Sequence, residues 1–280
     1  MVKKAQGTRL RNNKLTGKYW LETCNGRRIS MKFKLYSKKD IDGFIVLSTS
    51  IGKIVYHEKQ EELICHKGTA YSVSVNKVND NIYSVESGVG WEKLLCDTQG
   101  NRVLEEAIHE FLVMGNNLIA VCLYSTLNWG VLDVTNSRKP KWAIEPSIIW
   151  LNKNDETDYV VMDFSKNKGI FVFDKELKTV LGPLRYKYVD FLTSDLLAVQ
   201  DDGCWGVINL KGDIIVPVKY KSVLMSGEFF IVRQNKYGLL DKEGKCLLEC
   251  THDKIIEKDD KFVVRDFTTS EIFIAKKVSK

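Results

Sequence analysis

An internal repeat constrains the fold of this chain more than any other feature of its sequence. The two clearest copies lie near the C-terminus, at residues 205–212 (WGVINLKG) and 237–244 (YGLLDKEG). Each copy begins with an aromatic residue and a glycine, continues with two aliphatic residues and an Asn or Asp, and ends at a second glycine. The Asn or Asp and the final glycine are typical of a tight turn. Another apolar stretch follows, so each copy predicts short strands separated by turns.

The same pattern can be followed through the whole chain at a spacing of about 37 residues. Its second position falls at residues 20, 52, 94, 130, 169, 206 and 238. The match is good at 130, weaker at 94 and 169, and degenerate at 20 and 52. A unit of this length cannot bury its own apolar face, so neighbouring units must supply the core. The sequence therefore predicts an array of about seven units.

The expected fold is all-β. The chain is 44% hydrophobic and 28% charged, with 4 Pro, a composition that excludes a disordered or collagen-like chain. Four short strands per unit match a propeller blade, so we favour a closed, propeller-like array in which the last strand pairs with the first unit. An open β-solenoid explains the same period. One segment departs from the pattern: residues 104–112 carry apolar side chains at helical spacing and predict a short helix.

The string of Trp-Gly or Tyr-Gly, aliphatic pair, Asp, Gly, Ile-Ile-Val-Pro and Lys-Tyr resembles the WG-repeat family of bacterial β-rich repeat proteins. Residues 205–223 match this pattern best, including Pro217 and Tyr220. The resemblance is good over residues 129–280 and degenerate before residue 93. It implies a repeat scaffold used for binding, because the family has no common enzymatic activity that the resemblance would carry over.

The aromatic-glycine pairs are interpreted as structural anchors of the repeat. One large ring per unit can fill the space between successive sheets, and the adjacent glycine permits a bulge or the close approach of another strand. We therefore expect the rings to be largely buried. Trp142 and Trp150 lie off the repeat frame and are candidates for a surface patch. The anchors are Trp129, Gly130, Trp205, Gly206, Tyr237 and Gly238.

Positive charge is concentrated at the N-terminus. Residues 1–39 hold 12 basic residues and one acid, Glu22, a net charge of 12 − 1 = +11, and the other 241 residues carry 30 − 35 = −5. We expect residues 1–16 to form a flexible basic arm and residues 17–280 to form a single β-repeat domain. Such asymmetry favours a polyanionic partner. The candidate binding residues are Lys3, Lys4, Arg9, Arg11, Lys14, Lys18, Arg27, Arg28, Lys32 and Lys34.

Two functions are compatible with these features. The first is a non-enzymatic scaffold that engages a protein partner through a surface built by the repeats. The alternative is a nucleic-acid-associated accessory subunit of a prokaryotic complex, such as a defence or mobile-element system, which uses the basic segment. The orientation of Arg27, Arg28, Lys32 and Lys34 distinguishes the two functions. Lys32 and Lys34 alternate with Phe33 and Leu35, so one strand face is basic and the other apolar. A joint patch with the arm would favour nucleic acid, and neutralisation by acids of other repeats would favour the scaffold.

No catalytic or metal-binding motif is present in the sequence, so we expect neither enzymatic activity nor a cofactor. Cys246, Cys250 and His252 are close in sequence, but their even spacing follows from one strand face and no fourth ligand is near. The seven cysteines have no regular spacing, which favours reduced thiols and a cytoplasmic location. The N-terminus lacks the apolar stretch of a secretory signal, and no apolar run is long enough to predict a membrane partner.

Overall fold

The computed structural model describes residues 7–68, 72–87, 92–115, 117–137, 139–153, 156–157, 159–164, 168–258, 261–266 and 272–275. The chain divides into two compact units, Met1–Ile148 and Ile149–Lys280, where the sequence predicted a single domain over residues 17–280. In a repeat array each repeat contacts only its sequence neighbours, so the number of contacts can fall at any junction between two repeats. Here the boundary falls inside one long strand.

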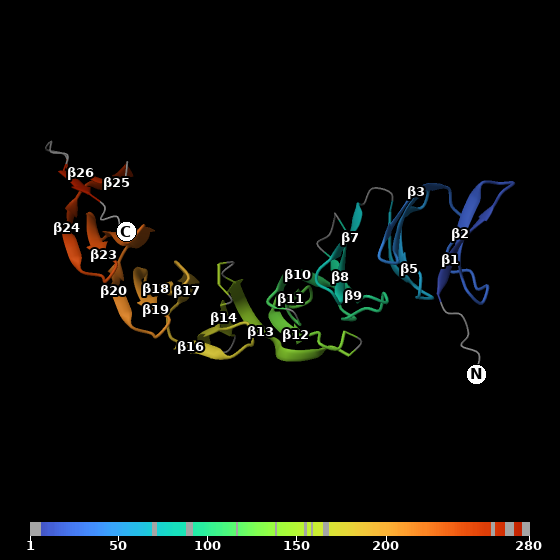
Figure 1. The fold of residues 1–280 in the computed structure, drawn as a ribbon, viewed down its shortest axis with the longest axis horizontal. Coiled ribbons are helices and arrows are strands. Elements are labelled where there is room, and N and C mark those ends of the chain that lie inside the picture. Colours follow the sequence, from blue (N-terminus) through green and yellow to red (C-terminus); the bar gives the residue numbers. More distant parts are fainter. Residues whose placement is uncertain are drawn as a thin grey trace. The chain divides into compact units, whose positions relative to one another are not determined.

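Unit 1 contains β1 (Thr8–Asn13), β2 (Lys18–Thr23), β3 (Leu35–Ile41), β4 (Phe44–Thr49), β5 (Gly52–His57), β6 (Leu63–Lys67), β7 (Val73–Lys77), β8 (Ile82–Ser87), β9 (Lys93–Asp97), β10 (Ile108–Val113), β11 (Leu118–Leu123), β12 (Trp129–Asp133) and most of β13 (Lys141–Lys153) (Figure 1).

Unit 2 contains the end of β13 and then β14 (Val160–Phe164), β15 (Gly169–Phe173), β16 (Thr179–Leu184), β17 (Tyr188–Phe191), β18 (Leu196–Asp201), β19 (Cys204–Asn209), β20 (Ile214–Tyr220), β21 (Ser222–Ser226), β22 (Phe229–Arg233), β23 (Tyr237–Asp241), β24 (Cys246–His252), β25 (Lys254–Lys258), β26 (Lys261–Arg265) and β27 (Ile272–Ala275).

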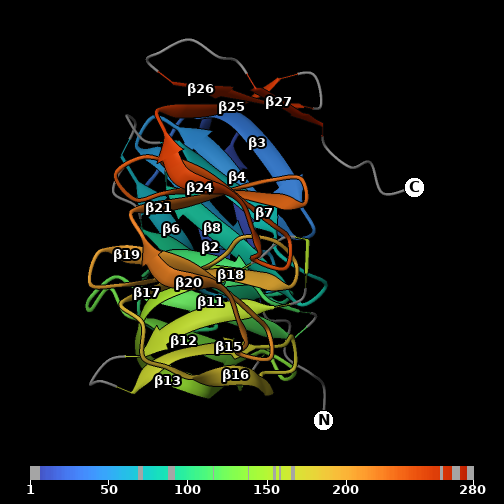
Figure 2. The ribbon, with the colours of Figure 1, turned by 90° about the vertical axis from the view of Figure 1, so that its left-hand side faces the viewer.

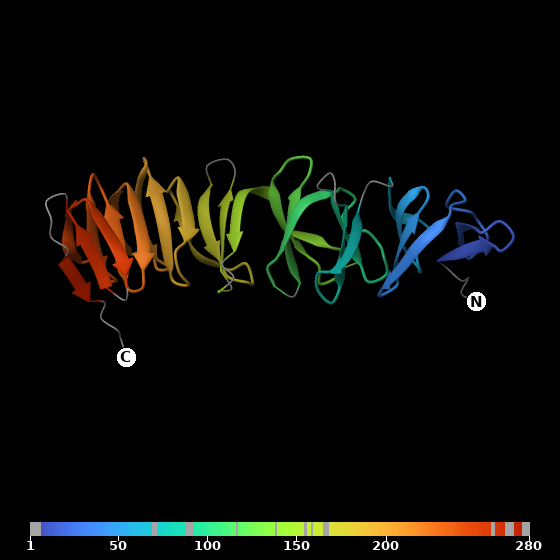
Figure 3. The same ribbon diagram turned by 90° about the horizontal axis from the view of Figure 1, so that it is seen from above.

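Every sheet is built from strands that are consecutive in sequence, and each described pairing is antiparallel. The strands β3–β6, β17–β20 and β21–β24 each form a four-stranded sheet, and β7–β16 follow one another in a single hydrogen-bonded order. Figure 2 and Figure 3 show these successive sheets in unit 2, from yellow to red. The predicted all-β fold is confirmed. A closed ring would require a pairing between the last strands and the first. Among the described strands β1 pairs with β2 and β27 pairs with β26, so closure of the array stays a prediction.

The predicted helix at residues 104–112 is wrong, because residues 108–113 form strand β10. A β-bulge lies between Ile108 and Glu110. The extra residue shifts the alternation of side chains by one position, so Ile108 and Phe111 both face the same core cluster. Apolar residues three apart on a bulged strand therefore imitated helical spacing.

All seven predicted repeat positions lie on strands, namely β2, β5, β9, β12, β15, β19 and β23. In the best-matching repeat, Trp205 pairs with Tyr220 and Val207 pairs with Val216, so β20 advances four residues while β19 advances two. The bulge of β20 lies opposite Gly206. A β-carbon built on Gly206 would lie 2.6 Å from the Val216 carbonyl oxygen, which is too close for any side chain.

Gly130 and Gly238 occupy equivalent places. A β-carbon on Gly238 would lie 2.8 Å from the Leu248 carbonyl oxygen, and one on Gly130 would lie 3.0 Å from the Ile144 carbonyl oxygen. Both glycines face a bulge in the next strand, as Gly206 does. The repeat glycine therefore lets the following strand bulge toward it.

The aromatic anchors differ from their predicted burial. Trp129, Trp205 and Tyr237 are equivalent in position, but each is only partly buried. Trp205 packs edge-on against Tyr188, with 5.6 Å between ring centroids. The rings therefore line the margins of the inter-sheet cores and do not fill them.

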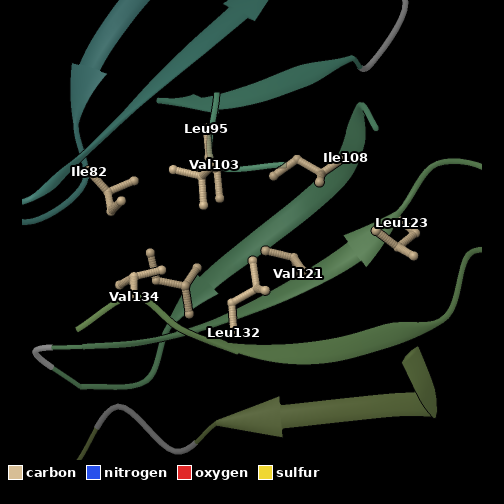
Figure 4. Close-up of a cluster of buried hydrophobic side chains, with 9 residues drawn as sticks. Ile82, Leu95, Val103, Ile108, Val121, Leu123, Leu132 and Val134 are labelled. Carbon is tan, nitrogen blue, oxygen red and sulfur yellow. The ribbon is translucent and has the colours of Figure 1, made fainter. Parts of the chain in front are cut away.

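The two off-frame tryptophans, which were candidates for a surface patch, instead cover the cores. Trp142 packs against the cluster shown in Figure 4, and its Cζ3 would lie 2.6 Å from a β-carbon on Gly130. Trp150 packs against the cluster between β14–β16 and β17–β20, and its ring centroid lies 5.4 Å from that of Tyr188. Both tryptophans lie on β13, and Gly130 on the neighbouring strand β12 makes room for the ring of Trp142.

The cores lie between successive groups of strands. Aliphatic side chains of β8, β9, β10, β11 and β12 meet in one cluster within the long β7–β16 sheet (Figure 4). Further clusters join β4–β6 to β7–β9, β14–β15 to β17–β19, the first sheet to β4–β5, β19–β20 to β22–β23, and β22–β23 to β25–β26. An inner sheet is therefore covered on both faces. The first sheet of unit 1 is different, because among the described residues a hydrophobic core covers only one of its faces.

His57 is a buried imidazole in unit 1. Its side chain is 0% exposed, and its ring packs edge-on against Phe44 with centroids 4.8 Å apart. Nδ1 accepts a hydrogen bond from the backbone N–H of Lys59, at 3.2 Å. Nε2 makes no hydrogen bond of good geometry with any described residue. The pKa of His57 is lowered, mainly by burial and also by the neighbouring charge of Lys59. Glu58, the Asp42 carbonyl and Asp97 act in the opposite direction, but their combined effect is smaller.

We predict that unit 1 loses stability as the pH falls from 7.5 to 5.5. The unfolded chain binds a proton at His57 near its ordinary pKa of about 6.5, but the folded chain resists it, so acid favours unfolding by at most about 1.4 kcal/mol per pH unit. Urea denaturation at several pH values measures the effect. His57→Leu should flatten this dependence, and His66→Gln, at an exposed imidazole, should not. An equal slope in all three proteins would contradict the prediction.

Candidate functional site

The basic N-terminal segment is part of the first sheet. Strand β1 pairs with β2 along its full length, from Thr8 opposite Thr23 to Asn13 opposite Lys18. Thr8 is buried, and its backbone N–H and hydroxyl donate to the carbonyls of Glu58 and Gln60 at 3.0 and 2.6 Å. Residues 8–13 are therefore a strand fixed to the next sheet, and the predicted flexible arm is wrong over these residues.

The two faces of this sheet have opposite chemistry. Leu10, Tyr19, Leu21 and Phe33 alternate with charged residues and pack into the core shared with β4 and β5. Residues 28–33 form a third row, since Glu22 pairs with Arg28 and Tyr19 with Phe33 in isolated bridges. Directly paired residues share a face. The other face, here called the basic face, consists of Arg9, Arg11, Lys18, Trp20, Glu22, Arg28 and Lys32.

Trp20 lies at the centre of the basic face. The guanidinium carbon of Arg28 lies 5.5 Å from its ring centroid, and Nζ of Lys32 lies 6.0 Å from it. The indole N–H donates to Glu22 at 3.1 Å, and Glu22 also accepts a hydrogen bond from Nε of Arg11 at 3.0 Å. Cation–π contacts of this kind hold cations beside the ring while leaving their N–H groups available.

Glu22 does not neutralise the basic face. Its pKa is lowered by the hydrogen bond from Trp20 and by Arg11 and Arg28, so it remains ionised at neutral pH. Five cations and one carboxylate leave 5 − 1 = +4 on this face. Among the described residues, Glu22 is the only acid that a salt bridge joins to these cations. The five cationic side chains are exposed to solvent.

The remaining predicted residues flank the basic face. Lys14 lies in the β1–β2 turn, Arg27 lies in the turn after β2, and Lys34 follows Phe33; all three are exposed. Lys3 and Lys4 lie outside the described residues. The sequence did not point to Trp20 as a functional residue, because it appeared there only as a degenerate repeat position. Its place between Lys18 and Glu22 on one strand face was the available signal.

Other predicted chemistry can be placed as follows. Within the described ranges no group of three or more His, Cys, Asp or Glu side chains is arranged to hold a metal. His252 instead lies 3.1 Å from a carboxylate oxygen of Asp266. All seven cysteines are free thiols. No described segment forms a helix that is both long and apolar enough to span a bilayer.

Residues 205–236 match the model of the WG containing repeat, so the family resemblance is confirmed over this segment. The match begins at Trp205 and covers β19 to β22, the region in which the repeat glycine and the bulge of the next strand were described above. No curated protein matches the chain.

Several solved structures are similar to the chain at low identity. Hsv2 of Kluyveromyces lactis is 12% identical, with 83% of this chain and 90% of that chain covered and a TM-score of 0.34. AztD of Citrobacter koseri is 14% identical, with 87% and 78% covered and a TM-score of 0.36. The dihydro-heme d1 dehydrogenase NirN is 12% identical, with 99% and 75% covered and a TM-score of 0.34. At these TM-scores the likenesses establish neither a shared fold nor a function.

Proposed function

We propose that this chain is a non-enzymatic binding protein whose basic face binds the phosphate backbone of a nucleic acid. The observation that supports the proposal best is the gathering of Arg9, Arg11, Lys18, Arg28 and Lys32 on one face of the first sheet. Cations of the N-terminal strand and of residues 28–32 form a single patch. This is the arrangement that favoured nucleic acid over a purely protein-binding scaffold.

The geometry suits an extended anionic polymer. Alternate residues of a strand lie about 6.8 Å apart and neighbouring strands about 4.8 Å apart, so the cations form a grid and not a closed pocket. Duplex DNA carries one negative charge per about 1.7 Å of its axis, which provides many partners for such a grid. Arg28 and Lys32 lie over the Trp20 ring and keep donors free for phosphate oxygens. Binding of this kind depends little on base sequence.

We predict a steep salt dependence of binding. If the five cations each neutralise one phosphate of a duplex, the slope of log K against log salt concentration should be near about −4.5. Fluorescence anisotropy of a labelled 20-base-pair duplex, titrated at several salt concentrations, measures this slope. Charge reversal is a better test than truncation, because removing residues 1–16 would remove strand β1 from the sheet.

The double variant Arg28→Glu/Lys32→Glu should flatten the slope by about 2 and weaken binding at low salt more than tenfold. The matched control is Lys211→Glu/Lys245→Glu, which changes the net charge equally at two exposed turns of unit 2. Equal losses in the two variants would mean that binding follows net charge and not the basic face. Absence of binding to duplex and single-stranded DNA and RNA at low salt would leave an acidic protein as the partner of this face.

A further inference from the structure

A half-buried carboxylate lines a cleft in unit 2. Asp163 on β14 pairs with Ile170 on β15, one residue after the repeat glycine Gly169. The equivalent residues of other units are Ala120 opposite Val131, Ala198 opposite Val207 and Ile231 opposite Leu239. All three are apolar and face an inter-sheet core or its margin. An acid at this place therefore departs from the repeat in a way that costs stability unless a partner compensates it.

The carboxyl group of Asp163 makes no hydrogen bond or ion pair with the described residues around it. Burial alone raises the pKa of its carboxyl group. In front of it lies a cleft of about 590 Å³, within the size range of small-ligand sites. The cleft is bounded by β13, β14, the start of β15 and the segment that follows β16. The apolar part of its lining consists of Ile149, Phe164, Ile170, Pro183 and Leu184.

The rim of the cleft carries the opposite charge. Lys168 and Arg185 are exposed and belong to its lining, and neither has an acidic partner among the described residues. Lys187 also lines the cleft, but Asp202 holds its ammonium group at 2.5 Å. The cleft thus combines one half-buried acid, apolar side chains and two available, exposed cations.

We propose that this cleft binds a peptide segment of a partner protein by accepting a lysine or arginine side chain. The aliphatic stem would lie against Phe164 and Leu184, its cationic end would pair with Asp163, and a neighbouring acidic residue of the peptide would meet Lys168 and Arg185. A metal ion is a poor alternative, because a single carboxylate supplies too few oxygen ligands. An anion is also a poor fit, since a half-buried acid is part of the lining. The cleft shares no residue with the basic face.

A matched pair of probes tests the proposal. One is a capped tripeptide of glycine, lysine and glutamate, and the other has glutamine in place of lysine. Nitrogen–proton correlation spectra of the whole chain, followed at the amides of Gly169 and Leu184, should show saturable shifts with the lysine tripeptide. Asp163→Asn should weaken this binding by about tenfold or more, because one charge-assisted hydrogen bond is lost. Glu176→Gln, an exposed change in the β15–β16 turn, should leave it unchanged.

Equal binding of the glutamine tripeptide, or binding that survives Asp163→Asn, would overturn the proposal, as would the absence of shifts at millimolar peptide. A second measurement tests its premise. Asp163→Ala places at this position the residue found at 120 and 198, so the thermal midpoint of unit 2 should rise. A lower midpoint would show that the carboxylate serves the fold, and the binding role would then be withdrawn.

Discussion

Replacing Gly206 with alanine is expected to destabilise unit 2 by about 3 kcal/mol or more. The new β-carbon would lie 2.6 Å from the Val216 carbonyl oxygen and 2.8 Å from the Val218 nitrogen. Both are backbone atoms, so the bulge of β20 would have to move away from β19. Because Gly206 is not among the residues with positive φ, steric contact with β20 and not backbone strain is the cause.

Gly203→Ala is the matched control for this experiment. A β-carbon on Gly203 meets nothing within 4 Å, but its φ is +77°, so alanine there costs only the strain of a left-handed backbone, about 1–2 kcal/mol. The urea midpoint of the unit-2 transition, followed by tryptophan fluorescence, compares the two variants. If Gly206→Ala cost no more than Gly203→Ala, the close approach of β20 would not be what the repeat glycine provides.

The repeat predicted the strands well because its signals are local. The turn after Asn209, for example, closes through the hydrogen bond from the Gly212 N–H to the Asn209 carbonyl at 3.0 Å and through the Asn209 side chain, as its sequence predicts. The burial of the aromatic anchors could not be predicted in the same way. The burial of each ring depends on the position of the bulged strand that follows it, which is β13, β20 or β24. That position is set by contacts between strands.

Strand β1 shows a different limit of the sequence. Its residues, TRLRNN, contain one aliphatic side chain, so neither alternation nor β-propensity identified a strand. Pairing with β2 and the two hydrogen bonds of Thr8 hold it in place. The candidate residues were taken from charge alone, and their arrangement around Trp20 required the register of β1 and β2. Asp163 was missed because one acid in a strand is unremarkable until its equivalents in other repeats are aligned.

Phe230→Ala is expected to cost about 3–5 kcal/mol, and Trp205→Ala about 1–2 kcal/mol, although tryptophan is the larger side chain and part of the repeat signature. Phe230 is 0% exposed between the sheets β17–β20 and β21–β24, where it packs with Val207, Val216 and Leu240. Removing its ring leaves a cavity that the surrounding sheets cannot close.

Trp205 lies at the margin of its core, so water can fill the space that its ring leaves. Circular dichroism during urea denaturation compares both variants with Leu224→Ala, whose parent side chain is 61% exposed and which should change stability by less than about 0.5 kcal/mol. If Trp205→Ala lowered the free energy of unfolding as much as Phe230→Ala, the aromatic anchor would be the main contact between the sheets. The expected order instead assigns that role to the aliphatic and phenylalanine side chains of the second and third strands, with the aromatic anchor covering their edge.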